Sequence, residues 1–159
     1  MPPEALIEHV NDSKKVPEKR REALWPELTR TALGYALGWV WPETIDEINI
    51  LQATKLACKL AFEAMPVEVT DVLTDALWQL DISARQFPIV HGDALSYSIA
   101  CASIIAKVSR DRYMIEQDAL YPEYGFVRNK GYGTAEHIAA LKKYGPCPIH
   151  RQTFIGKFL

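Results

Sequence analysis

The stretch from His91 to Tyr121 constrains the fold more than any other part of the sequence. After a turn at residues 91–93, apolar residues recur at three- and four-residue spacing, at Ile99, Ala102, Ile105 and Ala106. This spacing predicts a long helix with one buried stripe. Most residues around the stripe are small, so we expect the helix to lie very close to a neighbouring sheet.

The end of this apolar pattern carries one acid among three bases. The four charged residues are Lys107, Arg110, Asp111 and Arg112. Two interpretations fit them. The group is either a solvated cluster of salt bridges, or an anionic metal ligand beside cations that bind phosphate or tether the acid.

The rest of the chain alternates between helical and extended patterns. Helices are predicted from Pro17 through Leu28 and from Thr44 to Met65, the second burying Ile45, Ile48, Leu51, Leu56 and Leu60. A third is predicted after Thr134, which has the position of an N-cap, through Lys143. Strands are predicted at 31–41, 67–73 and 88–90. Strands alternating with helices indicate an α/β layer structure.

Composition narrows the class of protein. A chain of 159 residues with 48% hydrophobic residues has the length of one domain, and no apolar run is long enough to span a bilayer. The N-terminus lacks the pattern of a signal peptide. Three widely spaced cysteines argue against a disulfide framework or zinc site and favour a reducing cytoplasm. The four histidines show no metal-ligand spacing, which favours structural or exposed roles.

Net charge alone does not indicate a nucleic-acid partner, because it is −2. The bases are nevertheless grouped, at residues 14–21, 107–112 and 128–130. Local basic patches can contact phosphates without a basic total charge, although solvated helix faces would give the same pattern.

Two acids occupy positions suited to chemistry. Asp75 follows an apolar strand, and the carboxyl ends of strands are where α/β sites are commonly built. Asp111 lies in the long helix. Two carboxylates brought together need a cation between them, and oxygen ligands suit Mg²⁺ or Mn²⁺. Such ions activate water for phosphodiester cleavage. The alternatives are a turn residue for Asp75 and a surface ion pair for Asp111.

The loop at residues 130–134 places a tyrosine between two glycines. Flanking glycines allow close approach to a ligand, and Tyr132 beside Arg128 and Lys130 suits stacking on a sugar or base. A tight turn whose tyrosine packs on the protein body explains the pattern equally well.

Seven stretches, taken in order, resemble the type 2 ribonucleases H, the family of bacterial ribonuclease HII. They are NDSKK (11–15) with EKRREAL (18–24), IDEINILQATKLA (45–57), VLTDAL (72–77), GDALSYSIACASIIAKVSRDR (92–112), YPEYGF (121–126), NKGYGT (129–134) and PIHRQTF (148–154). They cover nearly the whole chain, and the motifs are specific.

The resemblance implies a ribonuclease H-like α/β fold, a mixed sheet flanked by helices, with a small helical C-terminal extension. It places a truncated catalytic domain at 1–120 and the extension with the Gly-Tyr-Gly loop at 121–159. The implied activity is Mn²⁺- or Mg²⁺-dependent endonucleolytic cleavage of RNA in RNA–DNA hybrids, including single ribonucleotides in duplex DNA, leaving a 5′-phosphate. The resemblance also implies a cytoplasmic monomer that acts in DNA replication and repair and has no membrane partner.

The same resemblance assigns roles to individual residues. Asp75 and Asp111 match two of four family carboxylates that hold the catalytic metal. Tyr132 resembles the tyrosine that stacks on the sugar at the RNA–DNA junction. The residues expected to contact nucleic acid are Asn11, Ser13, Lys14, Lys107, Arg110, Lys130 and Tyr132.

The sequence departs from the family at one motif. The family begins with a strand carrying a DEAGRG-type sequence, which supplies the other two carboxylates, and none occurs here. The first strand or strands are therefore expected to be missing, which opens a sheet edge. Three explanations fit: a longer working enzyme, an inactive short form, or a strand supplied by a partner. An inactive nucleic-acid-binding module of the same fold, and a small interaction domain that binds no nucleic acid, are the competing functions.

Overall fold

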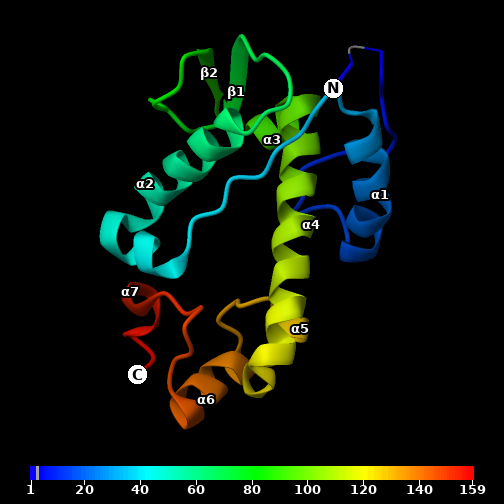
Figure 1. Cartoon of the computed structure of the whole chain (residues 1–159). Coiled ribbons are helices and arrows are strands. Elements are labelled where there is room, and N and C mark those ends of the chain that lie inside the picture. The colour runs from blue at the N-terminus through cyan, green and yellow to red at the C-terminus, as the bar shows by residue number, and fades with distance from the viewer. Residues whose placement is uncertain (3) are drawn as a thin grey trace. The chain divides into compact units, whose positions relative to one another are not determined.

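The computed structural model describes residues 1–2 and 4–159 of the chain (Figure 1). Its residues group into two units. The first unit comprises Met1–Trp39 and Thr54–Val108, and the second comprises Val40–Ala53 and Ser109–Leu159. Two helices, α2 (Pro42–Glu63) and α4 (Tyr97–Leu120), contribute residues to both units. The domain boundary expected at residue 120 stays a prediction.

The core of the first unit forms between α1 (Glu18–Thr31) and the N-terminal half of α4, which lie side by side (Figure 1). The predicted helix after Pro17 is confirmed. The buried apolar side chains are Ile7, Val16, Leu24, Leu28, Cys101, Ile104, Ile105 and Val108. Leu28 and Ile104 are fully buried, and each such side chain contributes about 1.5–3 kcal/mol to folding.

The predicted long helix is confirmed, but its predicted buried stripe is partly wrong. Ala102 and Ala106 are exposed, whereas Cys101 and Ile104 are buried. A methyl group buries little area, so alanines do not determine which face turns inward. The helix also starts later than expected, because Ser96 is extended and separates α4 from the short α3 (Gly92–Leu95).

A parallel pair of strands completes the first unit. Strand β1 (Asp71–Asp75) pairs with β2 (Arg85–Ile89), so both predicted strands exist with shifted boundaries. Two hydrogen bonds of 2.8 Å link the Gln86 side-chain amide to the backbone N–H and carbonyl of Leu80, which holds the connecting loop.

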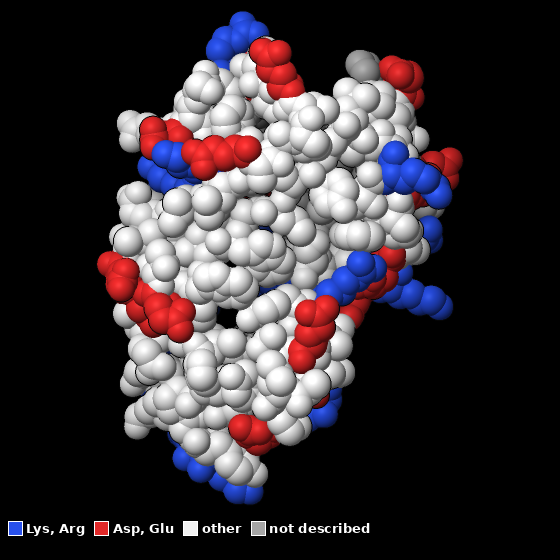
Figure 2. Space-filling view, in the orientation of Figure 1, with Lys and Arg blue, Asp and Glu red and all other residues white. Residues whose placement is uncertain are grey.

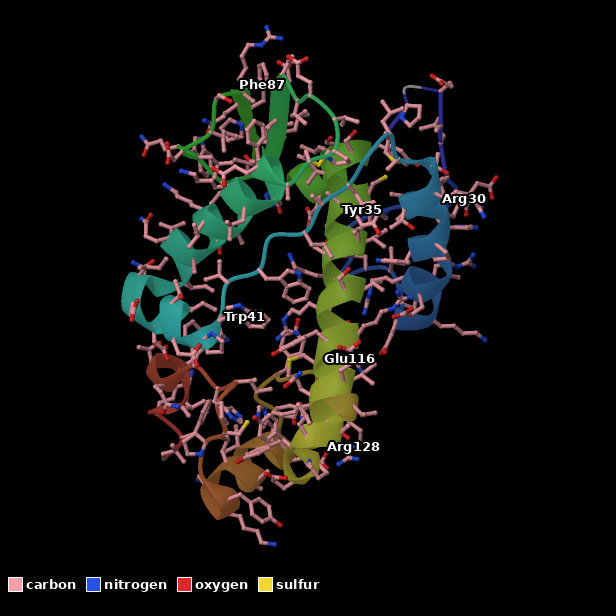
Figure 3. The ribbon with its side chains drawn as sticks, in the orientation of Figure 1. Arg30, Tyr35, Trp41, Phe87, Glu116 and Arg128 are labelled. Carbon is pink, nitrogen blue, oxygen red and sulfur yellow. The ribbon has the colours of Figure 1, made fainter. Side chains whose placement is uncertain are left out.

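One face of this strand pair exposes two large apolar side chains between charged residues. Leu73 and Phe87 are opposite each other in register, and their exposed fractions are 43% and 47%. Phe87 is labelled on β2 in Figure 3. The described strands therefore expose one apolar pair on a face that also carries the Asp71–Arg85 ion pair.

The predicted strand at residues 31–41 is wrong. Residues 32–41 are extended or bent but pair with no described strand. A Cβ on Gly38 would lie 1.8 Å from the carbonyl oxygen of Ala57, so the segment runs directly against α2. Trp25 and Tyr35 meet edge to face, with centroids 6.4 Å apart. The aromatic alternation thus serves packing rather than strand pairing.

Helix α2 begins two residues before the predicted start and is interrupted at Asn49, whose φ of 68° and ψ of 165° are not helical. The Asn49 side-chain oxygen accepts hydrogen bonds from the N–H groups of Leu51 and Gln52, at 3.0 and 3.1 Å, as an N-cap does. The predicted buried face is wrong: Leu51 and Leu60 are exposed, Ile45, Ile48 and Leu56 are half-buried, and the helix buries Ala53.

The second unit is helical. Besides parts of α2 and α4 it contains η1 (Pro122–Tyr124), α5 (Phe126–Asn129), α6 (Ala135–Tyr144) and α7 (Gln152–Ile155). Its buried core residues are Met114, Tyr124, Phe126, Ala140, Leu141, Cys147 and Ile155.

Two caps fix the helix starts in this unit. The Thr134 hydroxyl accepts from the His137 N–H at 3.3 Å, which confirms the predicted cap of α6. Asp46 accepts from the N–H groups of Gln152 and Thr153, at 2.6 and 3.1 Å, and from the Thr153 hydroxyl. An acid near the start of α2 therefore caps α7.

Candidate nucleic-acid interface and carboxylates

Asp75 is the last residue of β1 and its side chain reaches the start of α3. The Gly92 N–H donates to Asp75 Oδ1 at 2.8 Å. A Cβ on Gly92 would lie 3.3 Å from the Asp75 Cα and from the Thr74 carbonyl oxygen. Glycine therefore allows the backbone of α3 to approach the strand end closely enough to orient the carboxylate, which remains exposed.

The predicted backbone-binding loop lies at the same end of α3. Lys14 Nζ is 3.8 Å from Oδ2 of Asp93, which directly follows Gly92. Asn11 is exposed, whereas Ser13 is buried and its carbonyl accepts from Arg21 Nη1 at 3.0 Å. The first unit thus brings the loop and Asp75 together. Our sequence reasoning gave Asp93 no such role, although its position beside a glycine at a helix start was a signal.

Asp111 lies in the second unit and is buried, with an exposed fraction of 3%. Its Oδ1 is 3.7 Å from Nη1 of the neighbouring Arg110. That guanidinium also donates to the Lys130 carbonyl at 2.9 Å. Burial of Asp111 contradicts a fully solvated salt-bridge cluster, and Arg110 links the acid to the Gly-Tyr-Gly loop.

The loop at residues 130–134 presents Tyr132 to solvent. The ring has an exposed fraction of 54%, and the Arg110 guanidinium carbon lies 5.2 Å from its centroid. Asn129, a residue that the sequence analysis missed, supports the loop. Its side-chain oxygen accepts from the Gly131 N–H at 2.8 Å, and its amide donates to the Tyr124 carbonyl at 2.7 Å. An exposed ring on a braced backbone agrees with the stacking interpretation.

The two predicted lysines differ in accessibility. Lys130 is buried, and its ammonium donates to the Val127 carbonyl at the end of α5. Lys107 is half-buried and belongs to the first unit. Contacts of both with nucleic acid stay predictions.

The carboxylates are chemically suited to a hard divalent ion, because Mg²⁺ and Mn²⁺ prefer oxygen ligands. Asp75 belongs to the first unit and Asp111 to the second. Among residues 1–2 and 4–159, no group of three or more histidine, cysteine, aspartate or glutamate side chains could hold a metal ion. The oxygen donors fit a divalent ion, but the described residues supply too few of them for a complete metal site.

Charges of both signs are interspersed on the face that Figure 2 shows, with large uncharged areas between them. This agrees with the near-neutral total of −2. None of the helices in the described residues is long and apolar enough to cross a membrane.

Comparison with known proteins identifies the family. The ribonuclease HII family model matches residues 6–157. Ribonuclease HII of Caldanaerobacter subterraneus is 52% identical over 159 residues, covering 100% of this chain and 66% of that protein. Ribonuclease HII of Caldicellulosiruptor bescii is 49% identical over 154 residues, covering 97% of this chain and 75% of that protein. The chain spans slightly less than two thirds of the first of these relatives.

The fold comparison agrees. The crystal structure of ribonuclease H2 from Pyrococcus horikoshii matches with a TM-score of 0.77 at 24% sequence identity, covering 94% of this chain and 80% of that one. This likeness confirms the predicted ribonuclease H-like α/β fold. With a family match over nearly its whole length and relatives about half identical to it, the chain belongs to the ribonuclease HII family.

Proposed function

We propose that this chain carries substrate-binding and metal-binding residues of an endonuclease. The enzyme cleaves the RNA strand of RNA–DNA hybrids, including single ribonucleotides embedded in duplex DNA. The reaction is a divalent-metal-dependent hydrolysis that leaves a 5′-phosphate. The observation that carries the proposal is the ribonuclease HII match over residues 6–157.

In this proposal Tyr132 stacks on the sugar at the RNA–DNA junction, and its exposed ring supports that role. Lys14 contacts a backbone phosphate with the ammonium of a side chain that is 80% exposed. Asn11 and Ser13 shape the loop that presents it, while Lys107 and Lys130 are further candidates for phosphate contact. Arg110 serves both the substrate and the loop, because one guanidinium nitrogen is already bonded to the Lys130 carbonyl.

Asp75 and Asp111 would hold Mn²⁺ or Mg²⁺ in this proposal. A bound ion supplies an activated water and stabilises the leaving oxygen. The Gly92 N–H orients the Asp75 carboxylate, and Arg110 lies beside the Asp111 carboxylate. Further ligands are required, and the family's DEAGRG segment is the proposed source.

The incomplete donor set favours one second candidate, an inactive nucleic-acid-binding module of the same fold. It would bind hybrid duplex in a salt-dependent way without metal-dependent cleavage. Asp75→Asn would then change little.

The test compares this chain with a chimera that carries the DEAGRG segment of the Caldanaerobacter relative ahead of Met1. A labelled duplex with one ribonucleotide is incubated with each protein in Mn²⁺, in Mg²⁺ and in EDTA. We expect the chimera to nick the duplex 5′ to the ribonucleotide with either ion and not in EDTA. We expect Asp75→Asn and Asp111→Asn to abolish nicking.

The matched control is Asp81→Asn, because Asp81 is an exposed aspartate of the first unit that pairs with Lys59 and has no proposed role. It should cleave like the unsubstituted chimera. A folded chimera that binds hybrid without nicking it in either ion supports the binding module. One that neither binds nor nicks overturns both candidates.

We extend the proposal to a cytoplasmic monomer. Cys101 and Cys147 are buried free thiols, which suits a reducing compartment. Sedimentation of the purified chain in reducing buffer tests the oligomeric state, and a dimer would contradict it.

A further inference from the structure

A chain of hydrogen bonds runs through the interior of the second unit, from the Gly-Tyr-Gly loop to the segment before α7. His137 Nδ1 lies 2.9 Å from the Tyr132 carbonyl oxygen, and His137 Nε2 lies 2.9 Å from His150 Nε2. His150 Nδ1 lies 3.0 Å from the backbone nitrogen and from Sγ of Cys147. Both imidazoles are buried, with exposed fractions of 4% and 7%.

The chemistry of the two ends determines where the protons lie. A carbonyl oxygen can only accept, so His137 Nδ1 carries the hydrogen and its Nε2 is the acceptor of a neutral ring. His150 Nε2 must then donate to His137. His150 Nδ1 is left as an acceptor, which matches the backbone N–H of Cys147 that points to it. Each of the four ring nitrogens thus takes part in a hydrogen bond, and every donor points along the chain from Cys147 toward Tyr132.

An extra proton does not fit into this chain. A proton on His137 Nε2 would face the N–H of His150, and a proton on His150 Nδ1 would face the N–H of Cys147. In either case two donors would meet without an acceptor between them. The Cys147 carbonyl is an acceptor for a charged His150, but it is farther away, at 3.3 Å. Burial, and then the neighbouring His137, hold the pKa of His150 below its ordinary value of 6.5.

The surroundings also disfavour an imidazolium. A cavity of about 390 Å³ borders both histidines, and the charged side chains that line it are Arg110, Arg151 and Lys157. Rings cover the remaining sides: Tyr124 and Phe126 lie with centroids 4.9 and 5.7 Å from that of His150.

None of the described carboxylates is among the groups that shift the pKa of His150. The Tyr124 hydroxyl donates to the Gly145 carbonyl, and burial raises the pKa of the Cys147 thiol. Glu123 acts on Cys147 only through its charge, as a minor influence.

The loop end of the chain is the backbone of Tyr132. Its carbonyl accepts from His137 and from the Thr134 N–H at 2.8 Å, and its N–H donates to the Asn129 carbonyl at 2.8 Å. The backbone is held on both sides while the ring remains exposed. We propose that His137 and His150 are positioning residues that hold Tyr132 for substrate stacking, and that they do so only while both imidazoles are neutral.

The role in substrate stacking rests on the proposed function. The hydrogen-bond chain and its effect on the loop are tested without substrate. Nitrogen-15 NMR of the full chain at pH 7.5 should show opposite tautomers, Nδ1–H for His137 and Nε2–H for His150. On acidification, hydrogen exchange of residues 130–134, corrected for intrinsic rates, should rise as His150 takes up a proton.

Variants separate the hydrogen-bond chain from simple packing. His150→Gln keeps a donor at the position of Nε2 and cannot be protonated, so the loop should stay protected from pH 7.5 to 5. His150→Leu keeps bulk without a donor, and we expect about three- to tenfold faster loop exchange at every pH, the effect of losing one buried hydrogen bond. His137→Asn keeps a donor toward Tyr132 and breaks the link to His150, which gives a second variant if His150→Leu does not fold.

Binding of hybrid duplex in EDTA, measured by anisotropy at pH 7.5 and 5.5, completes the test. Binding by the unsubstituted chain should weaken at low pH more than binding by His150→Gln. Identical tautomers, or unchanged loop exchange in both His150→Leu and His137→Asn, would overturn the positioning proposal. If the loop loosens as expected and no variant binds hybrid at any pH, the positioning role stands and the proposed function fails.

Discussion

Gly131 is the position in the Gly-Tyr-Gly loop where a side chain would fit worst. Its φ is 77°, and a Cβ there would lie 3.1 Å from Cε of Met114. We expect Gly131→Ala to lower the free energy of unfolding by about 1–2 kcal/mol, because an L-residue is strained in the left-handed region. Thermal unfolding followed by circular dichroism measures the change.

Gly133 provides the matched control. A Cβ there meets only Cζ of Phe158, at an ordinary 3.9 Å. Gly133→Ala should therefore shift the melting temperature much less than Gly131→Ala. Equal shifts would mean that flexibility of the loop, and not the backbone angle at Gly131, requires glycine.

For single residues, the sequence predicted roles that depend on residue type and close neighbours. It did not predict the direction in which a side chain points. The sequence predicted the Thr134 cap correctly, because a cap depends on neighbours three residues away. It did not predict that the Lys130 ammonium turns inward to the Val127 carbonyl. Nor did it link His137 to His150, because the pair forms only when α6 and the segment before α7 come together.

Asn49 is the residue on which the shape of α2 depends. Asn49→Ala should destabilise the protein by about 1–2 kcal/mol, since it removes the cap of the second half and leaves a φ of 68° on alanine. Asn49→Gly tolerates the angle and should cost less. Urea denaturation of the three proteins compares them, and an alanine variant as stable as wild type would contradict the cap.

Asp46 joins the start of α2 to α7 through charge-assisted hydrogen bonds. The Thr153 hydroxyl first, and then the N–H groups of Thr153 and Gln152, hold the pKa of Asp46 below its ordinary value of 3.8. A lowered pKa means that these bonds stabilise the native state above pH 3.8 and are lost as the pH falls through the native pKa.

We therefore expect Asp46→Ala to increase hydrogen exchange of residues 152–155 at neutral pH. In wild type this exchange should rise as the pH falls below 3.8, and the variant should lack that rise. Glu47→Ala is the control, because Glu47 is the exposed acid next to Asp46. If both variants behave like wild type, the cap contributes nothing to the order of α7.

Elements with a strong local pattern were predictable, and elements decided by packing were not. The helix after Pro17 and the helix after Thr134 carry their own start signals. The segment at residues 31–41 alternates like a strand, but Gly38 brings it onto α2 instead. Alternation reports that two faces differ, and it does not identify the partner.

The candidate site was predictable as residue types and only partly as geometry. Asp75 was expected at a strand end and is found there, because the apolar strand directly before it is a local pattern. Links between distant stretches, such as Lys14 to Asp93 and Arg110 to Lys130, were not. No local periodicity encodes them.

For the whole molecule, the exposed pair of Leu73 and Phe87 predicts weak self-association at high concentration, above the range in which the chain is proposed to be a monomer. An exposed pair of large apolar side chains beside strand edges favours contact with other chains at high concentration. Replacing both residues with threonine should lower light scattering at high concentration with little loss of stability. Leu95→Thr removes an exposed leucine outside the strands and is the control. Equal effects of the two changes would exclude a specific role for the strand face.

Acid sensitivity below pH 6.5 is a second property of the whole chain. Burial holds the pKa of His150 below 6.5, so between that value and the native pKa the unfolded chain binds a proton that the native protein does not. The free energy of unfolding should therefore fall as the pH drops below 6.5. Urea titrations at pH 7.5 and 5.5 measure this fall, and His150→Gln should reduce it. A variant with the same fall as wild type would assign the sensitivity to other groups.

The division into two units bears on how the chain folds during synthesis. All described residues of the first unit have been made once Val108 has emerged, whereas the second unit combines Val40–Ala53 with Ser109–Leu159, which is made last. The cap on α7 closes last, since Asp46 is made more than a hundred residues before its partner Thr153. Such long loop closures slow folding. A nascent chain stalled before α7 should therefore resist protease in its first unit and be cut readily at Val40–Ala53.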